Sequence, residues 1–281
     1  MSDTPSERTY VLGNDPEELV RLDRQAALLD GPTRQLLRAA GIAPGMRVLD
    51  LGTGLGHVAR AVGEFVGPAG SVVALDNVAA VLAAARQRTE EAGTRNVKYV
   101  EGDVTAWQAE APFDAIVGRL LLFHVADPIA VVRHHLQNLK PGGLFVAIDY
   151  DIGASRTEPP VPQAEEVIRW VLAAFRAAGA WPTIGARLGV ILEDAGLTRI
   201  TSFGVQAYLP SRDAGGARGA ALLASVVRTL APTIVQRGIA TAQQLDLPNL
   251  QRRIEDATRA MDAVVLPPTL AGAWGYVPGP S

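Results

Sequence analysis

The sequence predicts an α/β protein built on a parallel β-sheet with helices on both faces. Between residues 46 and 150, short apolar strands alternate with amphipathic helices, which is the pattern of repeated strand–helix–strand units. The chain has 281 residues, enough for one large domain or two small ones. It contains no cysteine, which excludes disulfide frameworks, thiolate zinc sites and cysteine nucleophiles.

The N-terminal segment carries the signals of two short helices. Asp15 can cap a helix that has Pro16 at its first position, and apolar residues follow at helical spacing up to Leu29. Gly31-Pro32 is expected to break this helix. A second short helix should then end at Gly41.

The middle of the chain should form the sheet and its covering helices. Strands are expected at 47–51, 71–75, 97–100, 113–117 and 143–148, and helices at 58–66, 78–92 and 128–139.

The alternation lapses after Tyr150. The pattern predicts helices at 163–179 and 188–195, a strand at 198–208, mostly helix over 214–262, and a weak last strand at 270–277. Pro232 and Pro248 should interrupt the helical stretch.

A glycine-rich turn carries the strongest functional signal. The buried strand that contains Asp50 runs into Gly52-Thr53-Gly54-Leu55-Gly56, and a helix opens directly afterwards. Glycines let the chain bend sharply and let a ligand approach the backbone. In an open α/β sheet this turn lies at the carboxyl ends of the strands, where ligands bind.

Asp76 supports this interpretation because it ends the next strand, near the spacing at which a carboxylate meets a ribose diol. A dinucleotide fingerprint requires G-x-G-x-x-G, but His57 occupies its third glycine position. Asp50 would also repel a phosphate, so a positively charged ligand suits the turn better.

Together these segments resemble the class I S-adenosylmethionine-dependent methyltransferases, small-molecule branch. The matching segments are Val48 to Gly56 (motif I), Asp76-Asn77, Glu101 to Val104, Phe113 to Arg119, and Leu139 to Gly143. They follow the family order across residues 46–150. The front segment around Tyr10 and Gln25 also resembles that branch, although a helix that merely packs on the sheet is an equal alternative.

The resemblance implies S-adenosyl-L-methionine as cofactor, and Asp103 would take its adenine amino group. The implied cofactor-binding residues are Tyr10, Gln25, Asp50, Gly52, Thr53, Gly54, Asp76, Asn77, Gly102, Asp103, Val104 and Arg119. Arg119 would bind the cofactor carboxylate or the acceptor, unless it forms an ordinary salt bridge at a helix start.

The implied fold is a Rossmann-like seven-stranded sheet, with the last strand antiparallel, helices on both faces and a helical lid insertion. Residues 1–45 would form an N-terminal helical segment over the cofactor site, and 46–208 the core with a helical insertion near 155–180. Residues 209–265 would form a helical lid, and 266–281 the final strand and tail.

The implied chemistry is in-line transfer of a methyl group to O, N or C of a small molecule, such as a secondary metabolite. The candidate proton acceptors are His124, Asp149 and Tyr150, although a histidine beside an apolar run is more often a core residue. His134 and His135 are expected to be solvated. No metal is expected, because the fourth strand ends in Gly118-Arg119 rather than a carboxylate.

Composition limits the partners. A net charge of −3 argues against nucleic acid as a partner, and with no run of 18 apolar residues no membrane is expected. The polar start of the chain is unlike a signal peptide, so we expect a cytoplasmic protein, and a homodimer is left open. The alternatives are a cofactor-binding enzyme with a non-methylation reaction, a non-catalytic partner subunit and, more distantly, a nicotinamide oxidoreductase.

Overall fold

The computed structural model describes residues 29–279, and its centre is a seven-stranded sheet in the order β3-β2-β1-β4-β5-β10-β7. The strands are β1 (Arg47–Leu51), β2 (Ser71–Asp76), β3 (Val97–Glu101), β4 (Phe113–Arg119), β5 (Leu139–Asp151), β7 (Thr198–Val205) and β10 (Thr269–Tyr276). β10 runs antiparallel to both of its neighbours, β5 and β7, whereas β1 to β5 are mutually parallel. The predicted fold class is therefore confirmed.

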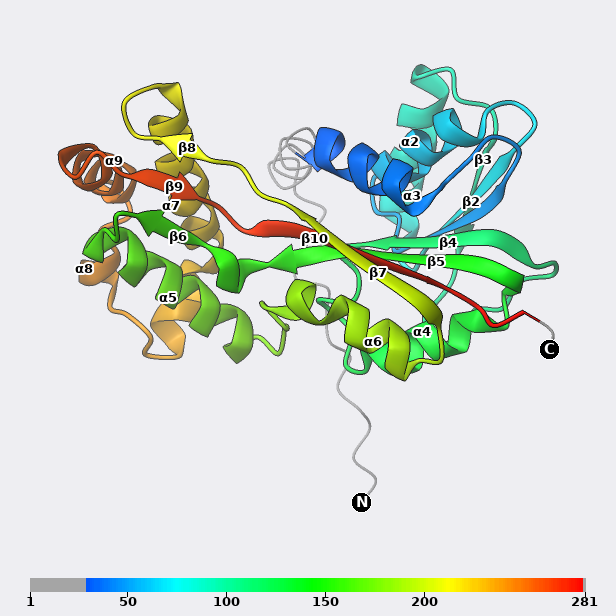
Figure 1. Ribbon diagram of the computed structural model, residues 1–281. Coiled ribbons are helices and arrows are strands. Elements are labelled where there is room, and N and C mark those ends of the chain that lie inside the picture. The colour runs from blue at the N-terminus through cyan, green and yellow to red at the C-terminus, as the bar shows by residue number, and fades with distance from the viewer. Residues whose placement is uncertain (1–28, 280–281) are drawn as a thin grey trace.

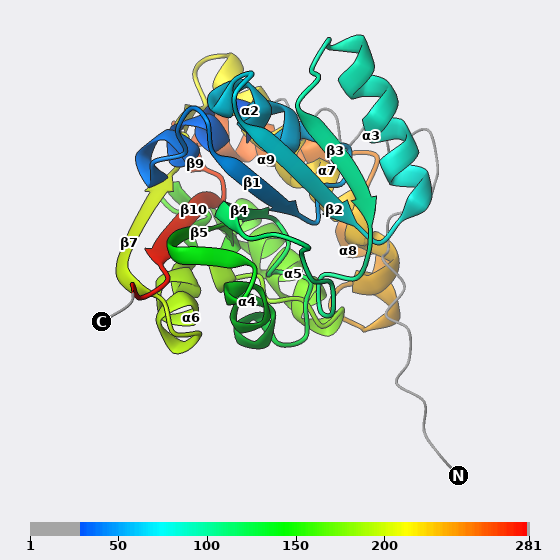
Figure 2. The same ribbon diagram turned by 90° about the vertical axis from the view of Figure 1, so that its right-hand side faces the viewer.

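Helices cover both faces of this sheet (Figure 2). The helix at 29–40, α2 (His57–Val66) and α3 (Ala79–Glu91) lie on one face, and α4 (Pro128–Leu136) and α6 (Leu188–Asp194) on the other. Successive side chains of each strand point to opposite faces of the sheet. In β1, Val48 belongs to the apolar cluster under α2, while Leu49 belongs to the cluster on the α4 side.

A second group of elements, which we call the cap, lies beyond one end of the sheet (Figure 1). Its helices are α5 (Pro162–Ala177), α7 (Ala214–Gln236), α8 (Ala242–Leu245) and α9 (Leu250–Ala260). Its small sheet has the order β6-β9-β8, made of β6 (Arg156–Glu158), β8 (Leu209–Pro210) and β9 (Val264–Leu266). Two 3₁₀ turns, η1 (Ile152–Ala154) and η2 (Ile184–Arg187), flank α5.

One continuous apolar cluster joins the cap to the α4 side of the sheet. It contains Phe123 and Phe145 from the core together with Val167 and Trp170 from α5 and Val227 from α7. β5 is 13 residues long and runs from the core up to the cap. The cap is therefore packed onto the core rather than tethered to it.

Two expected helix breaks were wrong. Gly31-Pro32 lies inside the helix at 29–40, whose buried Leu36 and Leu37 pack it against the sheet, whereas the helix expected from Asp15 lies outside the described residues apart from Leu29. α7 continues through Pro232, whose neighbours Ala231 and Ile234 are buried. The stretch 214–262 is mostly helical, as predicted, and the short strands β8 and β9 lie just outside its two ends.

Pro248 does separate two helices, α8 and α9, as predicted. By length and composition alone, α7 is long and apolar enough to cross a membrane. In this structure it packs against α5 and α9 inside the cap. Core helices of globular proteins can have the same length and apolar composition.

Candidate functional site

The glycine turn between β1 and α2 has Leu121 packed next to its first glycine and Tyr99 next to its last. Gly52, Gly54 and Gly56 all have positive φ angles, of 64°, 53° and 76°. A Cβ on Gly56 would lie 2.0 Å from the Tyr99 hydroxyl, and one on Gly52 would lie 3.0 Å from Leu121. Only glycine fits both the backbone conformation and the space, so the turn presents bare main chain at the end of the sheet.

Asp76 at the end of β2 is tied to this turn. One oxygen of its carboxylate accepts the Gly54 N–H at 2.9 Å, and the other accepts the Val78 N–H at 3.1 Å. The side chain is half-buried, and Asn77 beside it is exposed. Each carboxylate oxygen can accept a further hydrogen bond, so Asp76 can hold the turn and still receive two hydroxyls.

Asp50 lies inside β1 and is only 1% exposed. Burial raises its pKa to about 7, although a 2.6 Å hydrogen bond from the Thr53 hydroxyl and the nearby positive charge of Arg119 oppose this shift. A carboxyl held this close to neutrality gains strongly from a cationic ligand, because that ligand would favour the ionised form.

Arg119 connects three elements around Asp50. It leaves the end of β4, donates to the Thr33 hydroxyl of the helix at 29–40 at 3.1 Å, and lies near the Asp50 carboxyl and the Tyr150 side chain. Burial lowers the pKa of its guanidinium. The next residue, Leu120, has a φ of 54°, which is strained for a leucine. Backbone strain at this point turns the chain out of β4.

The loop after β3 folds around Asp103. One oxygen of its carboxylate accepts both the N–H and the hydroxyl of Thr105, each at 2.8 Å. Trp107 packs over Gly102, where an added Cβ would lie 2.7 Å from the indole ring. Asp103 itself is exposed, so a ligand can reach its carboxylate.

The expectation that His134 and His135 are solvated was wrong for His135, whereas His134 is half-exposed. His135 is fully buried and its Nε2 lies 2.8 Å from the Val104 carbonyl. Burial lowers its pKa to about 4. His134 contacts the Trp107 carbonyl at 2.9 Å. The helical spacing of His135 with the buried Val131 and Val132 was the sequence signal for its burial.

Asp149, near the end of β5, lies under the loop that follows β4. It is 1% exposed, and its Oδ2 accepts the Phe123 N–H at 3.2 Å. Its Oδ1 has no hydrogen-bond partner among residues 29–279. Burial raises the pKa of this carboxyl to about 7. In its present position Asp149 supports the loop and does not face an open site.

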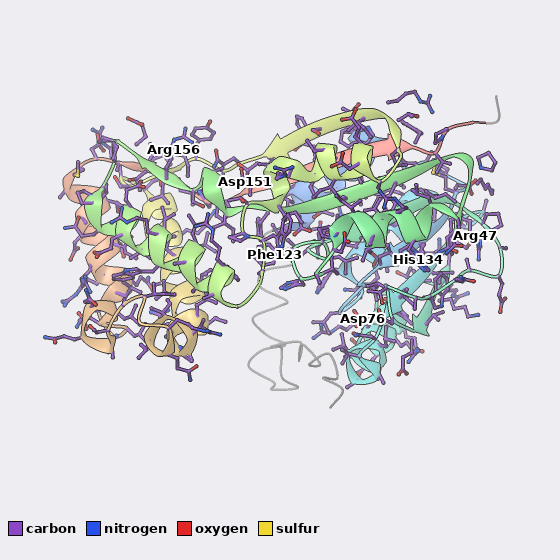
Figure 3. All side chains as sticks on the ribbon, turned by 90° about the horizontal axis from the view of Figure 1, so that it is seen from below. Arg47, Asp76, Phe123, His134, Asp151 and Arg156 are labelled. Atoms are coloured by element: carbon purple, nitrogen blue, oxygen red, sulfur yellow. The ribbon has the colours of Figure 1, made fainter. Side chains whose placement is uncertain are left out.

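His124 and Tyr150 are the more accessible of the three candidate proton acceptors. The exposed His124 ring packs edge-on against Phe123, with the centroids 5.0 Å apart, and partial desolvation lowers its pKa. Tyr150 is half-buried and lies on the Arg119 side of β5. Figure 3 shows Phe123 between the cap, marked by Arg156, and the elements that carry Asp76 (β2) and His134 (α4).

Two surface hollows accompany these residues. One of about 200 Å³ lies beside the Asp103 loop and the start of α4, and it is lined by Thr105, Val125, Ala126, Asp127, Ala130 and Val131. A larger one of about 270 Å³ lies between Asp151, η2, the edge strand β7 and its neighbour β10. The second is away from the glycine turn, so we assign the site to the residues around the turn.

The structure thus gathers most of the predicted residues at the carboxyl ends of β1, β2, β3 and β4. Tyr10 and Gln25 lie outside the described residues. Sequence reasoning missed Thr33, Leu121 and His135, which approach from other elements. Among residues 29–279, no group of three or more histidines and carboxylates gathers in a way that would hold a metal ion.

Known proteins share this arrangement in part. Residues 42–181 match the family model described as a methyltransferase domain. A ubiquinone/menaquinone biosynthesis C-methyltransferase of Shewanella woodyi is 33% identical over 119 residues, which is 42% of this chain and 47% of that protein. A protein-L-isoaspartate O-methyltransferase of Methanothrix thermoacetophila is 33% identical over 103 residues, 36% of this chain and 46% of that protein. The chain therefore spans about half the length of these curated relatives.

A solved structure shares the fold. The S-adenosylmethionine-dependent methyltransferase of Aquifex aeolicus superposes with a TM-score of 0.51 at 23% identity, covering 69% of this chain and 93% of that one. The sheet order, the glycine turn with its acidic companions and the family match agree with one another. This chain belongs to the class I S-adenosylmethionine-dependent methyltransferases.

Proposed function

We propose that this protein uses S-adenosyl-L-methionine to methylate a small molecule on O, N or C, and that the acceptor is a secondary metabolite. The observation that carries the proposal is the buried Asp50 beneath the glycine turn, with Asp76 at the end of the adjacent strand. A cationic ligand relieves the cost of ionising Asp50, and a ribose matches the second carboxylate.

The residues present fit the parts of this cofactor. Asp50 would face its positive charge, Asp76 its ribose, Asp103 and Val104 its adenine, and Arg119 its carboxylate. Gly52, Thr53, Gly54, Asn77 and Gly102 would supply the surrounding main chain and polar contacts. When bound, the cofactor supplies an electrophilic methyl group that a nucleophile attacks in line. The chain's own task is to hold both partners in near-attack geometry and to exclude water.

The acceptor would lie next to the loop after β4, between the sheet and the cap. We assign His124 as the proton acceptor for substrates that must lose a proton, because its lowered pKa keeps it neutral and its ring is exposed. Asp149 would position this loop through the Phe123 N–H. Tyr150 would contribute to the opposite wall, next to Arg119.

Calorimetric titration tests the cofactor. We expect S-adenosylhomocysteine to bind and NAD not to bind. The reverse result would refute the proposal in favour of an oxidoreductase, and binding of neither ligand would favour a non-catalytic partner subunit.

A screen of small-molecule acceptors with isotopically labelled cofactor tests the reaction. The expected result is transfer of the label to an acceptor and release of S-adenosylhomocysteine. His124→Ala should abolish transfer to an acceptor that loses a proton while leaving the affinity for S-adenosylhomocysteine unchanged. Turnover of the cofactor without label in any acceptor would point to a non-methylation reaction.

A further inference from the structure

Three side chains from the end of α4 and the turn after it bind the backbone of the loop after β3. His135 Nε2 lies 2.8 Å from the Val104 carbonyl, and His134 Nε2 lies 2.9 Å from the Trp107 carbonyl. Asn138 Oδ1 accepts the Ala109 N–H at 2.9 Å. The loop that carries Asp103 is therefore fastened at three points to the end of α4 and the turn that follows it.

The direction of these hydrogen bonds follows from their chemistry. A carbonyl only accepts, so His135 must carry its proton on Nε2 and donate it to Val104. The neutral ring then accepts at Nδ1, and the side-chain amide of Asn138 donates to it at 3.0 Å. The side-chain oxygen of Asn138 then accepts the Ala109 N–H. Each polar atom has a partner only in this arrangement.

One peptide unit links His135 to Asp103. The carbonyl of the Val104–Thr105 peptide receives the His135 hydrogen bond, while the N–H of the same peptide donates to Asp103 Oδ1 at 2.8 Å. Rotating this peptide would break both bonds at once. His135 therefore fixes the orientation of the Asp103 carboxylate although it does not touch it.

We propose that His135, supported by Asn138, is a positioning residue that sets recognition of the adenine amino group. The inference rests on the proposed function, in which Asp103 receives that amino group. A neutral, fully buried imidazole is a rigid donor, so the exposed Asp103 carboxylate is held ready before the cofactor arrives.

The test compares two ligands that differ at the adenine. S-adenosylhomocysteine carries the amino group, and S-inosylhomocysteine carries a carbonyl in its place. We expect the wild-type protein to prefer the adenine ligand. His135→Leu should reduce the ratio of the two dissociation constants about tenfold, the effect of losing one oriented hydrogen bond.

Three further variants separate positioning from general loss of structure. His135→Gln keeps an N–H donor and should restore part of the preference. Asn138→Ala, a milder change, should reduce the preference in the same direction even if His135→Leu does not fold. Arg133→Ala is the matched control, since Arg133 lies on α4 but donates to the Asp194 carbonyl on α6, so its preference should equal that of the wild type.

The outcomes are distinct. If His135→Leu and Asn138→Ala left the ratio of the two dissociation constants unchanged, whether or not both ligands bound more weakly, the positioning role would be refuted. The proposed function would remain intact. Wild-type protein that bound neither ligand would refute the proposed function and this inference with it.

Discussion

At the scale of single residues, the two carboxylates of the glycine turn have different surroundings. Asp76 is half-buried and already accepts two backbone N–H groups, whereas Asp50 is almost completely buried and held near neutrality. Substituting Asp50 or Asp76, or changing the pH, should therefore affect ligand binding differently. The affinity for S-adenosylhomocysteine measures this difference.

Asp76→Ala should weaken binding of S-adenosylhomocysteine by about 1–3 kcal/mol, because it removes the charged acceptor for the ribose hydroxyls and loosens the Gly54 amide. Asp76→Asn keeps one acceptor oxygen and should lose less. Calorimetric titration measures both. An unchanged affinity in Asp76→Ala would show that the ribose binds elsewhere.

Asp50 predicts a pH dependence of cofactor binding. Its pKa is raised to about 7 in the ligand-free protein, and the ionised form is the one that suits a cation. Affinity for S-adenosylmethionine should therefore rise as the pH increases through about 7 and level off above it. Titrations between pH 5.5 and 8.5 check this. Asp50→Asn should flatten the profile, and a flat wild-type profile would contradict the assignment.

At the scale of elements, the alternating strands and helices of residues 46–150 were predictable. Each element buries one face, and the spacing of the apolar residues within its own segment shows that face. The acids at the ends of β1, β2 and β3 followed from the same pattern. The contribution of Thr33 to Arg119 was not predictable, since it depends on how a helix packs over the sheet.

The cap was less predictable for a physical reason. β6 and β9 are three residues each, and they pair Glu158 with Val264, which are far apart in the chain. No local periodicity encodes such a pairing. Pro232 gave a misleading signal because the buried small residues of α7 outweigh its missing hydrogen bond.

Pro232 also yields a prediction about α7. Pro232→Ala restores a helical N–H at an exposed position inside the helix, and the proline's restriction of the unfolded chain offsets part of this gain. We expect the free energy of unfolding to rise by about 1 kcal/mol, with a higher Tm. Thermal unfolding with Pro248→Ala as control, a proline between helices, tests this. A lower Tm for Pro232→Ala would show that the proline is required by its packing.

At the scale of the whole molecule, buried titratable groups should shape the pH dependence of stability. Asp50 and Asp149 have pKa values raised to about 7, so between their unfolded values near 4 and pH 7 the folded state binds more protons. Each therefore loses stabilisation as pH rises through this window. His135, with its pKa lowered to about 4, acts in the opposite direction between pH 4 and about 6.5.

The two carboxyls outweigh the single histidine, so the cofactor-free protein should become less stable from pH 5 to pH 7.5. Urea unfolding at a series of pH values measures this. Asp149→Asn should reduce the slope, and so should saturating S-adenosylmethionine, which favours ionised Asp50. Stability that increased across this range would contradict the burial of both carboxyls.

The position of β10 has a consequence for synthesis of the protein. β10 follows every other strand in the chain, yet it lies inside the sheet between β5 and β7 and sits beside both cap and core. A chain still growing on the ribosome can pair β1 to β5, but β7 has no neighbour until residue 276 has emerged. A chain that ended before Thr269 would therefore lack β10 and leave β5 and β7 with exposed edges, which are a template for aggregation.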